Sequence, residues 1–320
     1  MADVAEHIEA AAPPSAAAGA PAVKTVELSK RFGHTVALAG LTMTVPRGEV
    51  FGFLGPNGAG KTTAVKLLLG LLRPTSGEGW LLGKPVGHLG TRRHIGYLPE
   101  LFRYQSWLSA AEVLALHCEL APLPRSSWKD EIKTVLDTVG LSDRANDRVG
   151  TFSKGMQQRL GLGAALLGEP ELVFLDEPTS ALDPVGRHDV REIIRSLASR
   201  GTAVFLNSHL LSEVEQVCDR AAVVDHGRVI ASGTMDELLG GGTAVRVRVA
   251  GLTPADKNKL SDFGRIDDED EQLTFASLSP DRVPELVAAI VGMGGRVFEV
   301  TPRHQTLEDR FLQLLEDEAK

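Results

Sequence analysis

Three stretches of the chain consist of consecutive apolar residues and end at glycine-rich or polar sequence. They lie at 50–54, 172–175 and 203–206. Runs this short, separated by longer segments of helical pattern, predict parallel strands that are buried on both faces of a sheet. Ligands of an open α/β sheet bind beyond the carboxyl ends of its strands, so we expect functional side chains directly after each run.

Other patterns extend this domain on both sides. Alternating apolar residues at 24–28 and 41–45 predict half-buried strands before the first buried run. The segment of about 104–160 has a helical pattern, which predicts a helical subdomain inserted into the sheet. The Ala- and Pro-rich residues 1–23 have no apolar periodicity and predict a disordered tail. We therefore expect the main domain to span 24–239.

A second domain is expected after the glycines at 240–242, which predict a linker. Strand patterns at 244–249, 272–276 and 296–300, with helical patterns at 284–291 and 306–315, predict a small α+β accessory domain over 243–320. An acidic run at 267–271 fits a solvated hairpin tip better than a metal site.

Composition limits the classes of protein that fit. The 320 residues carry a formal net charge of −8, with 43% hydrophobic and 24% charged residues, as in ordinary globular proteins. The phosphates of DNA and RNA repel an acidic protein, so we expect no nucleic-acid partner. No apolar stretch is long enough to cross a bilayer, and the acidic N-terminal residues do not fit a secretory signal. Cys118 and Cys218 lack metal-site spacing, which favours buried thiols in a reducing compartment.

The segment after the first apolar run has the pattern G-x-x-x-x-G-K-T between a strand and a predicted helix of helix-forming residues that continue to Leu72. Its glycines let backbone N–H groups converge on a phosphate, and the helix N-terminus adds a positive dipole end. Lys61 would reach the β- and γ-phosphates, and the Thr62 hydroxyl would hold Mg²⁺. The sequence therefore predicts an α/β P-loop NTPase that binds a nucleoside triphosphate. The binding residues are Gly55, Pro56, Asn57, Gly58, Ala59, Gly60, Lys61, Thr62 and Thr63.

The other two apolar runs end in side chains that complete a phosphate-transfer site. Asp176 follows the second run and would orient Mg²⁺, and Glu177 would polarise the attacking water as general base. His209 follows the third run, at the same predicted edge of the sheet, and would contact the γ-phosphate. The predicted catalytic residues are thus Lys61, Glu177 and His209.

An ordered set of motifs over about residues 24–235 resembles the nucleotide-binding subunit of an ABC transporter. The sequence Phe152-Ser153-Lys154-Gly155-Met156-Gln157 is similar to the family signature, usually Leu-Ser-Gly-Gly-Gln, and Ser180-Ala181-Leu182-Asp183-Pro184 is similar to the D-loop. Phe32 matches the aromatic residue that stacks on adenine, and His209 the switch histidine. The resemblance implies that Ser153, Lys154, Gly155 and Asp183 also bind nucleotide.

Two departures from the usual motifs resemble one subgroup of the family. Lys154 and Met156 replace the usual Gly and Gln of the signature, and Glu100 replaces the Q-loop glutamine, where a carboxylate could bind Mg²⁺ or water. Subunits of ABC-2-type exporters often show these residues, together with a closing segment like that at 306–312. The resemblance thus implies an ATPase that uses ATP and Mg²⁺ to power an exporter.

The resemblance also implies the fold and the partners. The ATPase domain would combine a mostly parallel sheet with antiparallel β and helical subdomains. Two chains, expected to be identical, would pack head to tail around ATP. Separate polytopic membrane subunits would complete the transporter, with this chain peripheral on the inner face of the membrane.

Two other functions remain open at this stage. One is the ATPase of an importer, which Glu100 and the closing segment speak against by resemblance. The other is a soluble ABC ATPase acting on ribosomes or DNA, but the chain has one copy of the motifs, no heptad arm and no Cys cluster. The accessory domain would either regulate or stabilise the dimer, or act as a stabilising appendage. The motifs do not identify the cargo.

Overall fold

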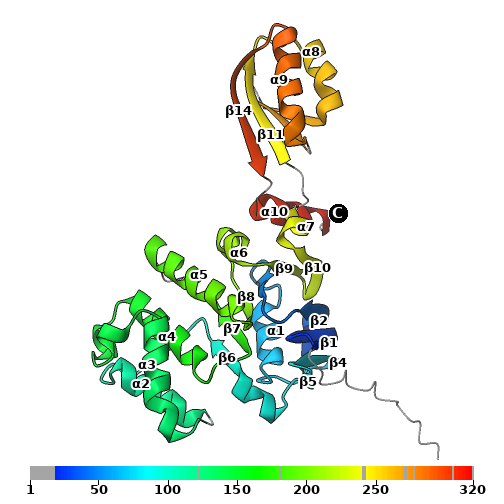
Figure 1. Cartoon of the computed structure of the whole chain (residues 1–320). Coiled ribbons are helices and arrows are strands. Elements are labelled where there is room, and N and C mark those ends of the chain that lie inside the picture. The colour runs from blue at the N-terminus through cyan, green and yellow to red at the C-terminus, as the bar shows by residue number, and fades with distance from the viewer. Residues whose placement is uncertain are drawn as a thin grey trace, which may run out of the picture. The chain divides into compact units, whose positions relative to one another are not determined.

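The chain forms two compact units in the computed structural model, Met1–Ser232 and Gly233–Lys320 (Figure 1). The structure describes residues 19–121, 123–180, 182–239, 243–269, 272–276, 278–304 and 306–318. The expected tail up to residue 18 and the glycine linker at 240–242 therefore lie outside the described residues. Among the described helices, none is long and apolar enough to cross a membrane.

The strands of the first unit form two sheets. A sheet of six strands has the order β10-β9-β3-β8-β7-β6, and a second sheet has the order β2-β1-β4-β5. The pairs β3–β8, β3–β9, β7–β8 and β6–β7 are parallel, as the continuous apolar runs predict. The strands are β1 (Val23–Phe32), β2 (Thr35–Val45), β3 (Val50–Leu54), β4 (Ser76–Leu81), β5 (Lys84–Pro85), β6 (Ile95–Leu98), β7 (Leu172–Asp176), β8 (Ala203–Asn207), β9 (Arg220–Asp225) and β10 (Arg228–Thr234).

The core of this unit lies between the two sheets. One cluster of buried side chains contains residues of β1, β2, β3, β7 and β8 together with α1 (Lys61–Leu68). Phe205 of β8 packs against Phe51, Phe53 and Phe174, with ring centroids 5.1 to 5.9 Å apart. Helices α5 (Pro184–Ser199) and α6 (Leu211–Val217) also pack against β3. The buried strands are thus held rigidly where their carboxyl ends carry the functional side chains.

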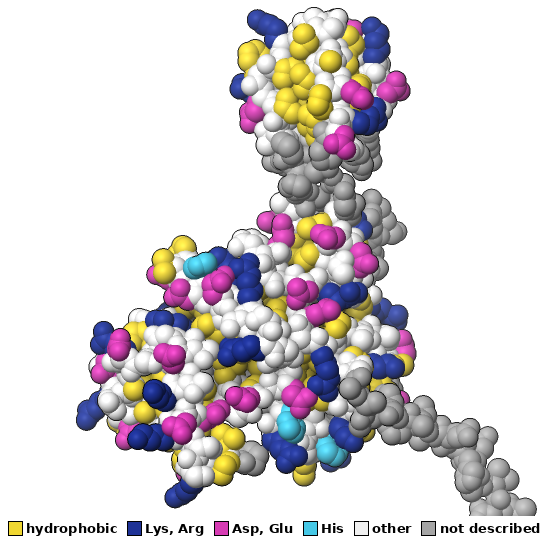
Figure 2. Space-filling view, viewed as in Figure 1, with side chains coloured by type: hydrophobic (Ala, Val, Ile, Leu, Met, Phe, Trp, Pro, Cys, Tyr) yellow, Lys and Arg dark blue, Asp and Glu magenta, His cyan; other side chains and the backbone are white. Residues whose placement is uncertain are grey.

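Three α-helices lie between β6 and β7 in the described part of the chain. The helices α2 (Ala110–Leu120), α3 (Trp128–Thr138) and α4 (Lys154–Leu166) contact one another, and α4 also packs on β6 (Figure 1). Helix α2 begins at a capping box in which Ser109 and Glu112 satisfy each other's backbone N–H groups. Figure 2 shows positive and negative side chains interspersed over the visible face of this unit.

The second unit is a four-stranded antiparallel sheet with helices. Its order is β12-β13-β11-β14, and the elements follow one another as β-α-β-β-α-β, which is the split βαβ arrangement of ferredoxin-like folds. Val245, Val247, Phe275, Leu286 and Ile290 belong to its separate apolar core. The elements are α7 (Met235–Leu239), β11 (Thr243–Ala250), α8 (Pro254–Lys259), β12 (Arg265–Glu269), β13 (Gln272–Ala276), α9 (Val283–Gly292), β14 (Arg296–His304) and α10 (Leu307–Glu318).

The observed boundaries differ from the expected ones in three places. Strand β1 begins at Val23, which is fully buried, so the ordered part starts before residue 24. The division between the units falls after Ser232, inside β10, and not at 239, because α7 packs against α10 of the second unit. Helix α1 ends at Leu68 although helix-forming residues continue to Leu72, since Gly70 adopts a left-handed conformation (φ 68°). The elements α8 and β12 were not predicted.

Candidate nucleotide site

The register of the parallel sheet brings the predicted site residues to one edge. Asn207, the last residue of β8, pairs with Phe53 of β3 on one side and with Asp176 of β7 on the other. Leu175 pairs in turn with Leu98 of β6, two residues before Glu100. The phosphate loop, the segment with His209, the two carboxylates and Glu100 therefore follow four adjacent strands, as expected for an open α/β sheet.

The phosphate loop requires glycine at its two ends. A Cβ at Gly55 would lie 2.2 Å from the carbonyl oxygen of Val224, and one at Gly60 would lie 2.3 Å from that of Ala37. Gly60 caps α1 and has a left-handed backbone (φ 99°). Gly58, within the loop, also has a left-handed backbone (φ 85°). The close approach of the neighbouring backbone thus excludes a larger residue at either position.

Lys61 turns back onto the loop that precedes it. Its Nζ donates hydrogen bonds to the carbonyl oxygens of Gly55 at 2.7 Å and Pro56 at 3.2 Å. Burial lowers the pKa of Lys61, and the negative charges of Glu177 and Asp176 oppose this shift. A half-buried ammonium beside the loop amides is suited to bind the phosphates of a nucleotide.

Two carboxylates at the end of β7 are buried, but their environments differ. Asp176 is 4% exposed and accepts a hydrogen bond at 2.5 Å from Nδ2 of Asn207. Burial raises the pKa of Asp176, and the Asn207 hydrogen bond acts in the opposite direction. Glu177 is 7% exposed and contacts His209, whose backbone N–H donates to Oε1 at 2.9 Å and whose Nδ1 lies 2.7 Å from Oε2.

Glu177 also has an unusual backbone. Its φ of 53° is in the left-handed region, which non-glycine residues adopt at a cost of about 1–2 kcal/mol. Its N–H donates to the carbonyl oxygen of Asn207 at 2.9 Å, and its own carbonyl oxygen accepts from Ser180. The neighbouring strand thus stabilises a turn that points the Glu177 side chain toward His209.

Glu100 follows β6, the strand beside β7, and its side chain is exposed. Its negative charge contributes to the raised pKa values of Asp176 and Tyr97, after the larger effect of burial on each. The carboxylate that replaces the expected glutamine is therefore close enough to Asp176 to act on it electrostatically.

The remaining predicted binding residues lie on other elements. Phe32 ends β1, opposite Thr35 of β2, with its ring 48% exposed and Lys30 Nζ 5.1 Å from the ring centroid. Ser153 caps α4 and accepts the N–H of Met156, and Asp183 caps α5 and accepts the N–H of Gly186. Ser153, Lys154 and Asp183 are exposed. Within the described part of the chain, no hydrogen bond or ion pair joins these three residues to the phosphate loop, so their binding roles remain predictions.

The contact of Asn207 with Asp176 is the feature that the sequence interpretation missed. A polar residue at the end of a fully apolar strand was the available signal, but its partner depends on the strand order.

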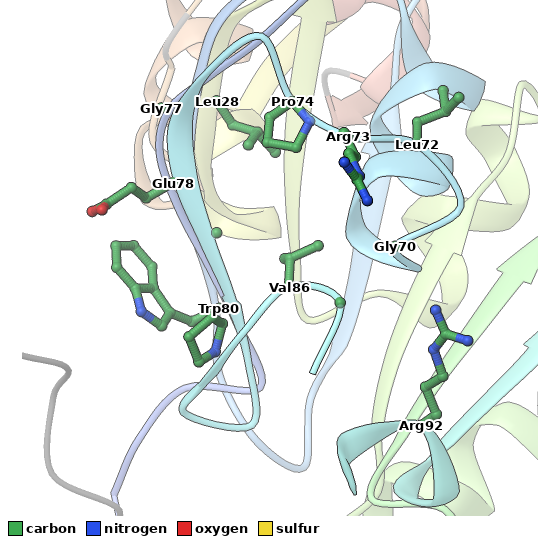
Figure 3. Close-up of a pocket in the computed structure, with 13 residues that line it drawn as sticks. Leu28, Gly70, Leu72, Arg73, Pro74, Gly77, Glu78, Trp80, Val86 and Arg92 are labelled. Carbon is green, nitrogen blue, oxygen red and sulfur yellow. The ribbon is translucent and has the colours of Figure 1, made fainter. Parts of the chain in front are cut away.

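Figure 3 shows a further cavity of the first unit, with Arg73 and Arg92 along it. Its volume is about 560 Å³. That cavity is lined by none of the loop residues 55–63 and is separate from the nucleotide site.

Comparisons with known proteins agree with this geometry. The family model described as ABC transporter matches residues 38–180. An uncharacterised ABC transporter ATP-binding protein of Nostoc sp. is 42% identical over 88% of this chain and 84% of its own length. The daunorubicin resistance ATP-binding protein of Streptomyces coeruleorubidus is 40% identical over 91% of this chain and 95% of its own length. Further relatives are named for resistance, transport or export.

Solved structures give the same match for the first unit. The structure of an ATP-binding subunit of an ABC transporter superposes with a TM-score of 0.62 and 31% sequence identity. It covers 68% of this chain and 91% of that subunit.

Proposed function

Because this chain belongs to the ATP-binding proteins of ABC transporters, which are ATPases, we propose that it powers an ABC-2-type exporter through separate membrane subunits. Support comes from relatives that are named for drug resistance or export and that span nearly the same length. The observation that carries the catalytic part is the buried pair Asp176 and Glu177 beside Lys61 and the phosphate loop.

ATP is the substrate that this site fits. The loop amides and the N-terminus of α1 would bind its phosphates, and Lys61 would exchange its carbonyl partners for phosphate oxygens. The exposed ring of Phe32 would stack on the adenine. A Lys61 that is already half-buried loses little additional hydration when the nucleotide arrives.

The side chains also fit Mg²⁺, which prefers oxygen ligands and keeps several waters. Thr62, Asp176 and Glu100 would hold it together with phosphate oxygens. Among the described residues, no group of three or more His, Cys, Asp or Glu side chains could hold a metal. Phosphate oxygens and waters would supply the other ligands. When bound, Mg²⁺ would neutralise charge that develops on the phosphates.

Glu177 would act on the attacking water. Its carboxylate is held by the His209 backbone N–H and is otherwise buried, so it can accept a proton in a fixed orientation. The His209 ring, 55% exposed, would contact the γ-phosphate on one side and Glu177 on the other, and would so link the position of Glu177 to bound ATP.

A second copy of this chain would complete each site. Ser153 and Lys154 are exposed at the N-terminus of α4, where free N–H groups can stabilise phosphate charge from across an interface. Asp183 is similarly exposed at the start of α5. We therefore propose a head-to-tail homodimer that closes on ATP, opens after hydrolysis and passes this motion to membrane subunits at the cytoplasmic face.

The test is purification of tagged Glu177→Gln protein from solubilised cells with ATP and Mg²⁺, followed by identification of the bound partners. We expect a stoichiometric polytopic membrane protein. Lys61→Ala, which weakens phosphate binding, is the matched control and should retain less of any ATP-dependent partner. Recovery of ribosomal proteins or DNA without a membrane partner would overturn the exporter function and leave the ATPase activity intact.

A further inference from the structure

Asn207 lies between the strand that precedes the phosphate loop and the strand that ends at Asp176. It lies at the end of β8, in the middle of the sheet, and pairs in register with both Phe53 and Asp176. Its side chain is 3% exposed, and that of Asp176 is 4% exposed. The hydrogen bond of 2.5 Å between them therefore forms away from solvent, where its orientation is maintained by the packed strands.

The same residue contacts both acidic residues, but in two different ways. Its side-chain amide donates to Oδ1 of Asp176, and its backbone carbonyl oxygen accepts the N–H of Glu177. The second contact stabilises the left-handed turn at Glu177. A change of the Asn207 side chain would remove the first contact and leave the second, so the two effects can be separated.

The chemistry of the amide suits a site that must attract a cation. A lysine or arginine in this place would orient the carboxylate but would also cancel its charge. A neutral amide donor fixes one oxygen of Asp176 and leaves the net negative charge of the site unchanged. Oδ1 of Asn207 is buried and has no hydrogen-bond partner among the described residues, an arrangement that is unfavourable in a purely structural role.

We propose that Asn207 is a positioning residue for Mg²⁺, acting through Asp176. This inference rests on the proposed metal role of Asp176. By occupying Oδ1, the amide presents the remaining carboxylate oxygen to the metal in one orientation. Partners that orient metal-binding carboxylates typically contribute about 10–100-fold to metal affinity.

The experiment measures how much Mg²⁺ strengthens nucleotide binding. Full-length protein is titrated with a fluorescent, non-hydrolysable ATP analogue in excess Mg²⁺ and in EDTA, and the Mg²⁺ coupling ratio is the quotient of the two affinities. We expect Asn207→Leu and Asn207→Ala to lower this ratio about tenfold or more, with the affinity in EDTA unchanged within about twofold. Leucine fills the space of the amide and alanine does not, so agreement between them excludes a packing effect.

Ser208→Ala is the matched control. Ser208 is 1% exposed, and its hydroxyl accepts the N–H of Leu210 at 3.1 Å, whereas Asp176 accepts its side-chain hydrogen bond from Asn207. Its coupling ratio should equal that of the wild type. An equal loss in Ser208→Ala and Asn207→Leu would show a general disturbance of the strand end and overturn the proposal.

A double-mutant cycle separates the metal role of Asp176 from the positioning role of Asn207. Asp176→Asn should lower the ratio, and Asn207→Leu added to it should lower it little further, because the two residues act as one unit. A loss with Asp176→Asn but none with Asn207→Leu would overturn the positioning role alone. An unchanged ratio in Asp176→Asn would overturn the metal role of Asp176 and the positioning role with it, while ATP binding in EDTA would still identify the phosphate loop as intact.

Discussion

His209 lies against both carboxylate oxygens of Glu177, but only its backbone donates a hydrogen bond. The His209 backbone N–H donates to Oε1 at 2.9 Å, and the ring Nδ1 lies 2.7 Å from Oε2. The ring contact is close but is not a hydrogen bond, since Oε2 has no hydrogen-bond partner among the described residues. The backbone contact is the firmer of the two, because it is fixed by the end of β8, whereas the ring is 55% exposed and free to reorient toward a ligand.

Replacing Glu177 by glutamine should stop hydrolysis but not binding. The amide keeps the size of the side chain but cannot take a proton from water, so turnover should fall about 10²–10⁴-fold. With ATP and Mg²⁺ the variant should accumulate as a dimer in light scattering. Glu169→Gln is the control, since Glu169 also has a left-handed backbone (φ 48°) but lies before β7, outside the site. A monomer of Glu177→Gln under these conditions would argue against ATP-driven dimerisation.

His209→Ala should test the ring separately from the backbone. The variant retains the N–H that binds Oε1, so Glu177 stays oriented and only the ring contact is lost. We expect kcat to fall about 10²-fold, with KM for ATP nearly unchanged. Combining it with Glu177→Gln should add little, because the two groups act together. Fully additive losses in steady-state kinetics would show that they act independently.

Gly60 and Gly58 form a matched pair for the shape of the phosphate loop. Both have positive φ, so alanine at either position costs about 1–2 kcal/mol in backbone strain. A Cβ at Gly60 also collides with the Ala37 carbonyl, whereas one at Gly58 has no atom within 4 Å. Gly60→Ala should therefore lose about 1–3 kcal/mol more in urea unfolding. Equal losses in the two variants would mean that the strand adjusts without cost.

His117 should make the first unit less stable in mild acid. Burial lowers its pKa below 6.5, and its ring packs edge-on against Tyr104 at 5.8 Å. As the pH falls, His117 takes up its proton in the unfolded chain before it does so in the folded protein. The stability that the neutral ring contributes is therefore fully present above pH 6.5 and decreases as the pH falls from there toward the folded-state pKa. His117→Gln should show a shallower decrease between pH 7.5 and 5 in urea unfolding. Parallel pH curves for the two proteins would contradict this expectation.

The division after Ser232 predicts where the chain can be cut. Residues 1–232 should unfold cooperatively and bind ATP, since their core shares no side chain with the second unit's core. A fragment ending at 239 retains α7, whose Leu238 is 5% exposed in the full chain, and exposes that residue without α10. It should therefore aggregate more readily in light scattering. Unchanged ATPase activity and dimerisation in 1–232 would exclude a regulatory role for the accessory unit.

The elements that the sequence predicted well are those with the strongest local patterns. The runs at 50–54, 172–175 and 203–206 became β3, β7 and β8 within one residue, because few other structures bury so many consecutive apolar side chains. The weaker α8 and β12 were missed because their sequences are mainly polar and charged. Strand β12 depends on pairing with β13, and local periodicity does not report such pairing.

By itself, the sequence determined the phosphate loop, the acidic strand end and the order of the motifs, because each depends on residue types at fixed local spacing. It also indicated the transporter family, since several such motifs coincide. Only the tertiary structure decided that Asn207 lies between the phosphate-loop strand and Asp176, and that His209 holds Glu177. These contacts join residues 31 and 32 positions apart. They follow from the order of strands in the sheet, which long-range packing selects and no local pattern specifies.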